Sequence, residues 1–293
     1  MSKLIIEHAP AKVNLALHVT GRRDDGYHLL DTLVTFTDAG DIISVEPGSS
    51  DTLTIEGPFG HQLPAASDNL VLRARDLLRT LSGTRTPVVI RLEKNLPIAS
   101  GIGGGSSDAA ATLRALCKLW QIDIAEDELA RHALALGADV PMCLHSRSLV
   151  ARGIGETLHA ASLPTVPLVL VNPGVPVATP AVFRALERRN NSALPPLQHT
   201  RSAGSLAEWL ALTRNDLEAP ARSVVPQIGA VTAALREQGS VLARMSGSGA
   251  TCFGIFAEDD EAQRAAAAIA SANPSWYVKA TRTLERASED VTP

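Results

Sequence analysis

Aromatic side chains and basic charge are both scarce in this sequence. Only 3% of its 293 residues are aromatic, and 27 lysines and arginines stand against 31 aspartates and glutamates. The resulting net charge of -4 provides no basic surface along which a phosphate backbone could bind, and few rings are available to stack on bases. We therefore exclude general nucleic-acid binding.

Cysteine and long apolar runs are also lacking. Cys117, Cys143 and Cys252 are far apart and odd in number, which fits neither a disulfide framework nor a paired-thiol zinc site. No stretch approaches the roughly 20 apolar residues that span a bilayer. The opening MSKLIIEHAP reaches Glu7 and His8 too early for the apolar core of a secretory signal. These absences predict a protein of the reducing cytoplasm with no membrane partner.

The remaining composition is that of an ordinary globular protein. Hydrophobic residues make up 45% of the chain and charged residues 20%. The length suits one large domain or two medium ones, and either can bury a substantial core.

The first half of the chain combines strand and helix patterns. Apolar residues alternate with Lys12, Asn14 and His18, which predicts a strand on which these polar side chains share one face. A turn is expected over 21–26. Further strands are predicted at 29–36, 41–46 and 87–93, and helices at 108–120 and 125–136. A helix after Ser67 should end at Gly83.

The pattern changes after two prolines at 162–167. A buried strand is predicted at 168–171, and Thr179 with Pro180 should start a helix through about Glu187. Residues 190–205 lack periodicity, which predicts a mobile surface loop. Strands at 241–245, 251–256 and 276–281 and a helix at 259–270 complete the order β, α, β, β, α, β. This order is typical of a ferredoxin-like split βαβ domain, with a boundary near 160–167.

A glycine-rich stretch lies between a predicted strand and a predicted helix. Residues 101–107 read GIGGGSS, so the backbone can turn and present its N–H groups at a helix N-terminus, which favours an anion site. A Walker A loop is disfavoured because no lysine occurs from Gly101 to Leu113. A dinucleotide-binding loop is also disfavoured, since Ser106 takes the place of the third glycine. A merely flexible loop is the remaining alternative.

Three other features have simple structural alternatives. The second glycine cluster, 245–250, reads MSGSGA and by itself predicts a tight hairpin turn. Asp139 in LGADVP is by itself best explained as a helix N-cap. Lys12 could be a solvated strand residue, and His28 a structural histidine.

Taken together, these segments resemble the GHMP kinase superfamily. The resemblance is carried in order by PAKVNL at 10–15, GYH at 26–28, PIASGIGGGSSDAA at 97–110, LGADVP at 136–141 and RMSGSGA at 244–250. It implies an α+β protein with two domains. Residues 1–162 would form a mixed α/β, ribosomal S5 domain 2-like domain for ATP binding and catalysis, and 163–293 a ferredoxin-like domain for substrate binding.

The resemblance also implies a reaction. Its PAKVNL and GYH segments match the branch that uses ATP and Mg²⁺ to phosphorylate the 2-hydroxyl of a cytidine diphosphate-linked methylerythritol in the non-mevalonate route to isoprenoid precursors. Lys12 and Asp139 match the catalytic pair. Asp139 would accept or orient the hydroxyl proton, and Lys12 would keep Asp139 ionised and stabilise the transferred group.

Other matched positions imply two binding sets. The ATP set consists of Asn69 by the adenine, with Pro97, Gly101, Gly103, Gly104, Gly105, Ser106 and Ser107. The substrate set consists of Asn14, Tyr27, His28, Thr179, Phe183, Gly247, Ser248 and Gly249. In the second set, His28 and the rings of Tyr27 and Phe183 would serve the cytosine. Metal ligands cannot be named from the sequence.

The chain departs from the family pattern at two places. Val34 stands where some members have an aromatic residue, so the cytosine site would rest on two rings. Ala99 and Ser100 replace a frequent glycine. Another GHMP small-molecule kinase or decarboxylase and a non-catalytic nucleotide-binding relative remain alternatives. The expected partner is the small-molecule substrate, and the expected state is a monomer or weak homodimer.

Overall fold

The chain folds into two compact units that interleave along the sequence. The computed structural model describes residues 3–63 and 68–284. The first unit consists of 1–12, 39–99 and 103–146, and the second of 13–38, 100–102 and 147–293. Strands β1 (Ile5–Arg22) and β2 (His28–Pro47) each contribute residues to both units. The predicted boundary between 162 and 163 stays a prediction; the last strand of the first sheet ends at Ala160 and the first strand of the second sheet begins at Pro167.

Strand β2 is continuous where the sequence predicted two strands. Gly40 does not break it, because that glycine serves a close approach to β1. A Cβ on Gly40 would lie 2.6 Å from the carbonyl oxygen of Ala9 and 2.9 Å from Cα of Pro10. Proximity between strands, rather than a turn, explains the glycine.

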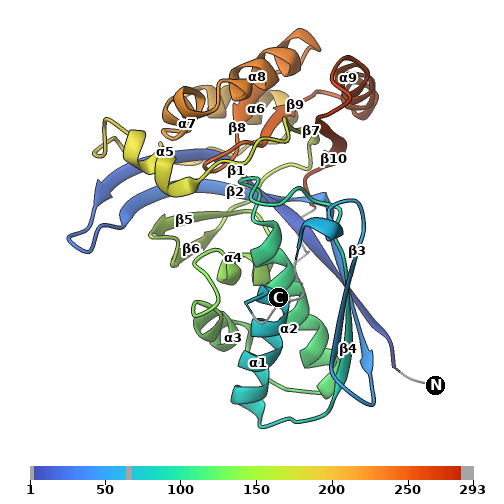
Figure 1. Cartoon of the computed structure of the whole chain (residues 1–293). Coiled ribbons are helices and arrows are strands. Elements are labelled where there is room, and N and C mark those ends of the chain that lie inside the picture. The colour runs from blue at the N-terminus through green and yellow to red at the C-terminus, as the bar shows by residue number, and fades with distance from the viewer. Residues whose placement is uncertain (1–2, 64–67, 285–293) are drawn as a thin grey trace, which may run out of the picture. The chain divides into compact units, whose positions relative to one another are not determined.

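The sheet of the first unit has the order β3, β4, β2. Strand β4 (Val88–Glu93) pairs antiparallel with β2 and parallel with β3 (Thr52–Glu56). The short 3-10 helix η1 (Gly60–Gln62) follows β3. Two longer helices, α1 (Leu70–Ser82) and α2 (Gly104–Trp120), lie side by side (Figure 1). Helices α3 (Glu126–Ala133) and α4 (Val140–His145) complete this unit.

Two helix starts differ from the predicted ones. Helix α1 is capped by Asn69, whose side chain accepts a hydrogen bond from the N–H of Val71, while Ser67 lies outside the described residues. Gly83 ends α1 in the left-handed conformation, as predicted. Helix α2 starts at Gly104, four residues earlier than the pattern indicated, so part of the glycine-rich stretch is its first turn.

The second unit contains a four-stranded antiparallel sheet with the order β10, β7, β9, β8. Numbered along the chain, this is the order 4-1-3-2, and the predicted ferredoxin-like β, α, β, β, α, β succession is confirmed. Its strands are β7 (Pro167–Asn172), β8 (Leu242–Met245), β9 (Cys252–Ile255) and β10 (Tyr277–Arg282). Its helices are α5 (Thr179–Ala185), α6 (Ala203–Ala211), α7 (Glu218–Val224), α8 (Gln227–Glu237) and α9 (Asp259–Ala272).

Helices α8 and α9 pack on this sheet (Figure 1). A buried cluster that includes Val171, Ile228 and Phe256 forms the core between them. Elsewhere in the second unit, β5 (Leu149–Gly153) and β6 (Thr157–Ala160) extend the sheet from the N-terminal half of β2.

The loop predicted over 190–205 ends at Ser202, because α6 begins at Ala203. Residues 190–202 form neither helix nor strand, yet the structure holds them by specific bonds. Asn191 donates from its side chain to the carbonyl of Val19, and the N–H of Leu194 donates to the carboxylate of Asp31. The Ser192 carbonyl lies 2.9 Å from Nδ1 of His18. The mobile loop that the composition indicated is therefore a segment anchored to β1 and β2.

Arg244, on β8, is a buried cation that binds backbone carbonyls. Its guanidinium donates to the carbonyl oxygens of Leu15, Leu210 and Thr213 at 2.8 to 2.9 Å. Burial lowers the pKa of Arg244 to about 10, so the side chain is still charged at neutral pH. It thereby joins β1 and the end of α6 to the strand that precedes the second glycine cluster.

Replacing Arg244 with Met should destabilise the protein, because the buried carbonyls would lose their donors and each unsatisfied group costs about 1–3 kcal/mol. We expect Arg244→Met to lower the free energy of unfolding by about 3 kcal/mol in urea denaturation. Arg236→Met is the matched control, since Arg236 is exposed and donates to the carbonyl of Ala243 at 3.3 Å. Equal midpoints for the two variants would contradict this role.

Candidate active site

The two residues of the predicted catalytic pair are in direct contact. Nζ of Lys12 lies 2.7 Å from Oδ2 of Asp139, and both residues belong to the first unit. The Lys12 side chain is 7% exposed and that of Asp139 is 41% exposed. The pair thus combines a sheltered cation with a carboxylate that a ligand can reach.

Lys12 on β1 is buried, whereas the simple alternative for it was a solvated strand residue. Both faces of β1 are buried around this position, since Lys12 and Asn14 are as inaccessible as Val13 and Leu15. A solvated strand lysine is therefore excluded. Burying an ammonium group is costly without a partner, and Asp139 provides one.

The simple alternative for Asp139 is also wrong. Asp139 occupies the N-cap position of α4, but its side chain makes no capping hydrogen bond. Instead its carboxylate accepts from Lys12, 127 positions away along the chain. Its side chain therefore serves the ion pair, and α4 starts without a side-chain cap.

The start of α2 lies against two lysine side chains. Gly103 has a φ of +65°, and a Cβ there would lie 3.1 Å from Cβ of Lys12. A Cβ on Gly104 would lie 3.1 Å from Nζ of Lys94. These two glycines permit a close approach that other residues would obstruct, and they bring the N-terminal N–H groups of α2 next to positive charge.

Lys94 belongs to a buried cluster that the sequence analysis missed. Its Nζ donates to Oδ2 of Asp41 at 2.5 Å and to Oδ2 of Asp108 at 2.6 Å. The other oxygen of Asp41 accepts from the N–H groups of Asn95 and Leu96, which orders the segment after β4. The lysine and both aspartates are almost completely buried.

The cluster holds one carboxyl group in its protonated form over part of the physiological range. Burial, reinforced by the negative charge of Asp41 and opposed by Lys94, raises the pKa of Asp108 to about 8. Burial also tends to lower the pKa of Lys94, but the two aspartates outweigh it and the net shift is upward. A charged Lys94 beside a protonated Asp108 reduces the negative charge that the buried cluster would otherwise hold.

A cavity of about 220 Å³ in the first unit adjoins this cluster. Its lining includes Asn69, Leu70, Leu92, Gly105 and Asp108. Asn69 and Gly105 come from the predicted ATP set, and the structure brings them together here. Oδ1 of Asp108 is buried and has no hydrogen-bond partner within the described residues.

The other predicted ATP residues vary in their contacts. Ser107 is buried and its hydroxyl donates to the carbonyl of Pro10, while Ser106 is only partly buried. Pro97 is buried just before the glycine-rich stretch. Gly101 belongs to the second unit, where a Cβ on it would lie 2.6 Å from the carbonyl oxygen of Gly249.

The predicted substrate residues all lie in the second unit, and several touch one another. The rings of His28 and Phe183 stack with centroids 4.6 Å apart. The hydroxyl groups of Thr179 and Ser248 are 2.8 Å apart. Thr179 does not cap α5 as predicted, because the N-cap position is Ala178.

His28 is suited to reading a neutral base. Burial, together with the charges of Arg22 and Arg189, lowers the pKa of His28, so its ring is neutral at pH 7 and offers one donor and one acceptor. Its Nε2 is buried and unpartnered among the described residues. Tyr27 beside it is 63% exposed, whereas Val34 lies in the core and offers no surface to a ligand.

The second glycine cluster forms the turn between β8 and β9, as the hairpin alternative predicted. It also contacts β1: the Ser246 hydroxyl accepts from the N–H of Asn14 and donates to the carbonyl of Gly101. A Cβ on Gly247 would lie 2.8 Å from that same carbonyl oxygen and 3.3 Å from Oδ1 of Asn14. Oδ1 of Asn14 is buried without a hydrogen-bond partner in the described part of the chain, so a ligand donor could pair with it.

Thiol chemistry does not fit this site. All three cysteines are free, and burial raises the pKa of the Cys143 and Cys252 thiols well above their usual range. A thiol that stays protonated is a poor nucleophile.

Among the described residues, no helix has the length and apolar character needed to cross a membrane.

Comparison with known proteins identifies the class. The profile for the GHMP kinases N terminal domain matches residues 69–147, and the profile for GHMP kinases C terminal matches residues 182–275. The chain belongs to the GHMP kinase family.

Within this family, the similar proteins share one enzyme name. The chain is 55% identical to the 4-diphosphocytidyl-2-C-methyl-D-erythritol kinase of Chelativorans sp. (strain BNC1), with 94% of each chain covered. It is also 55% identical to the enzyme of that name from Rhizobium etli (strain CIAT 652), over 96% of this chain and 95% of the other. A crystal structure of 4-(cytidine 5'-diphospho)-2C-methyl-D-erythritol kinase is similar at a TM-score of 0.80 and 38% identity, covering 96% of this chain and 100% of that one.

The pH dependence of stability should report the buried cluster. A folded-state pKa of about 8 for Asp108 lies above the roughly 3.9 of an unfolded aspartate, so the folded protein holds a proton that the unfolded chain has lost between these values. The contribution of Asp108 to the free energy of unfolding therefore falls as pH rises from about 4 to 8. Asp108→Asn should remove this loss, and its melting temperature relative to wild type should increase from pH 5 to pH 8. Melting temperatures of Asp108→Asn and wild type that change equally with pH would argue against a raised pKa of Asp108. Asp76→Asn changes an exposed carboxylate and is the control, for which the difference from wild type should not depend on pH.

Proposed function

We infer that this chain is an ATP-dependent kinase that phosphorylates the 2-hydroxyl of 4-diphosphocytidyl-2-C-methyl-D-erythritol, a step toward isoprenoid precursors. The substrate is supported by near full-length identity of 55% to kinases of that name. The reaction is supported by the contact between Lys12 and Asp139, which is the observation that carries the proposal.

The pair has the chemistry that phosphoryl transfer needs. Such transfer depends on positioning and on charge stabilisation, with an acceptor for the hydroxyl proton. The exposed carboxylate of Asp139 can accept or orient that proton. Lys12, held beside it, can stabilise the negative charge that develops on the transferred group.

We place ATP in the first unit. The cavity lined by Asn69 and Gly105 would take the adenine, and the N-terminal N–H groups of α2 would bind phosphate oxygens. Mg²⁺ is commonly held by substrate phosphates and only one or two protein oxygens, and it neutralises phosphate charge when bound. Ser106 is partly buried in the first turn of α2, and its hydroxyl would supply one protein oxygen to the Mg²⁺.

We place the cytidine diphosphate end of the substrate in the second unit. The neutral ring of His28 would read the cytosine edge, and the rings of Phe183 and Tyr27 would provide stacking surfaces. The loop from Gly247 to Gly249, with the Thr179 and Ser248 hydroxyl groups beside it, would contact the diphosphate.

Two alternatives remain distinguishable by experiment. Another GHMP kinase activity would appear in a substrate panel that offers mevalonate and homoserine beside the cytidylyl substrate. A non-catalytic relative would be expected to lack one of the two catalytic residues, and both are present here. Transfer of labelled phosphate from ATP to the cytidylyl substrate is the primary test. Phosphorylation of mevalonate or homoserine in its place would overturn the proposal.

The role of Asp139 can be separated from any capping role. Asp139→Asn keeps the size of the side chain and, as a helix cap, asparagine is about equal to aspartate. It removes the charge that pairs with Lys12. We expect kcat to fall by roughly 10² to 10⁴, the usual contribution of a positioned proton acceptor, with little change in ATP affinity. The melting temperature should fall because the buried Lys12 loses its charged partner, but the variant should remain folded. Turnover near the wild-type value would disprove the catalytic assignment.

The role of Phe183 can be tested by truncation. Stacking on a base contributes about 1–3 kcal/mol, so Phe183→Ala should raise the KM for the cytidylyl substrate by roughly tenfold or more. The KM for ATP should change much less. Equal changes in both constants would mean that the ring only packs against His28.

A further inference from the structure

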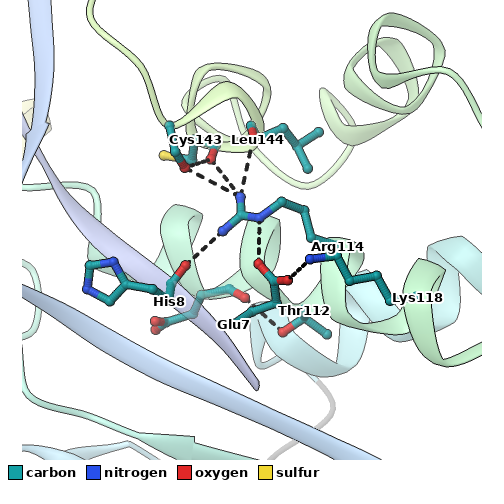
Figure 2. Close-up of polar contacts among 9 residues, drawn as sticks. Glu7, His8, Thr112, Arg114, Lys118, Cys143 and Leu144 are labelled. Carbon is teal, nitrogen blue, oxygen red and sulfur yellow. Dashed lines mark hydrogen bonds and ion pairs between the residues drawn. The ribbon is translucent and has the colours of Figure 1, made fainter. Parts of the chain in front are cut away.

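Arg114, in the middle of α2, contacts two other elements of the first unit. Its Nε donates to the carboxylate of Glu7 at 3.0 Å, and its Nη2 donates to the carbonyl of His8 at 2.8 Å. Its Nη1 donates to the carbonyls of Cys143 at 3.0 Å and Leu144 at 3.3 Å (Figure 2). One guanidinium group therefore connects the start of β1 to the end of α4.

The contacts on α4 act where that helix is weakest. Helix α4 has six residues, and a helix this short has little stability of its own. The last carbonyl groups of a helix have no partner within it, and they carry partial negative charge. Arg114 satisfies two of them with a cation, and the hydroxyl of Ser146 accepts from the same Nη1 at 3.4 Å. The C-terminal end of α4 is thus held by Arg114.

The residue at the other end of α4 is Asp139. Because six helical residues extend only about 9 Å, a displacement of the C-terminal end is passed on to the start of the helix. On β1, Lys12 follows His8 by four residues, about 13 Å along an extended strand. Arg114 therefore binds both elements that carry the catalytic pair, each at the end remote from the pair.

We propose that Arg114 is a positioning residue for phosphoryl transfer, and that it sets the place of Asp139 relative to Lys12 by fixing α4 against β1. This inference rests on the proposed role of the Lys12–Asp139 pair. Among the residues that the structure describes, Arg114 makes no hydrogen bond to Lys12 or to Asp139. A lysine could keep the charge but not the planar fork that reaches both elements at once.

The chain offers a matched control on the same helix. Lys118 is four positions after Arg114 and donates to the other oxygen of Glu7 at 2.5 Å. Its side chain is 62% exposed, and its amino group makes no contact with α4 within the described residues. Lys118→Met therefore removes a cation from the same carboxylate without releasing α4.

The experiment compares Arg114→Lys, Lys118→Met, Asp139→Asn and the double variant Arg114→Lys with Asp139→Asn. A misplacement of about 1 Å can reduce a rate by about 10², so kcat of Arg114→Lys should fall by roughly 10- to 100-fold. The KM values for ATP and for the cytidylyl substrate should stay within about threefold of wild type, since neither predicted binding set includes Arg114. Lys118→Met should retain wild-type kcat.

The double variant distinguishes positioning from a general loss of structure. If Arg114 acts through Asp139, its substitution should reduce kcat little further once Asp139 is Asn, and the two effects will be strongly non-additive. The inference would be overturned if the two substitutions reduced kcat by the product of their separate effects. It would also be overturned if Arg114→Lys lowered the melting temperature but not kcat, or if its KM values rose as kcat fell.

Failure of the proposed function would look different. It would appear as a wild-type enzyme that does not phosphorylate the cytidylyl substrate or as an Asp139→Asn variant with full turnover. Should Arg114→Lys fail to fold, Glu7→Gln weakens the same guanidinium contact more gently. It should lower kcat several-fold with unchanged KM, and wild-type kcat in that folded variant would refute the positioning role.

Discussion

The first turn of α2 depends on the contact between glycine backbone and two lysine side chains. A Cβ on Gly103 would lie 3.1 Å from the side chain of Lys12, and a Cβ on Gly104 would lie 3.1 Å from that of Lys94, both tighter than an ordinary van der Waals contact. Each lysine is in turn held by carboxylate groups from other elements. The start of α2 therefore packs closely on both lysine side chains, and a side chain added at either glycine would require the neighbouring lysine to shift.

The two lysines have different consequences because their partners differ in exposure. Lys94 is buried between Asp41 and Asp108, and the proton on Asp108 reduces the negative charge beside the lysine. Such a cluster can order the backbone around it, but it gives little net charge to a ligand. Lys12 has a partner, Asp139, whose side chain reaches solvent. The first cluster therefore contributes geometry, and the second pair is available for chemistry.

Local patterns predicted most of the secondary structure and failed at identifiable places. Two strands were predicted at 29–36 and 41–46 where β2 is continuous, and Gly40 between them serves a close approach to Ala9 and Pro10. The positions of Asp41 and Asp108 could have predicted that they are buried. Each aspartate stands where the hydrophobic pattern of its strand or helix places a buried side chain. Asp41 shares a strand face with Ile43, and Asp108 precedes the buried alanines of α2. A charged residue at a position that the hydrophobic pattern places in the core indicates a buried ionic partner. The sequence alone does not identify that partner.

The sequence by itself determined the alternation of β1, the helix stop at Gly83, the glycine stretches and, through the order of its motifs, the kinase family. These depend on neighbours a few positions apart or on the identity of single residues. Only the tertiary structure decided that Asp139 binds Lys12 instead of capping α4, that Lys94 is buried between two aspartates, and that Arg114 connects β1 to α4. The physical reason is that charge pairing and burial depend on distances between residues far apart along the chain, and those distances exist only once the strands and helices have packed.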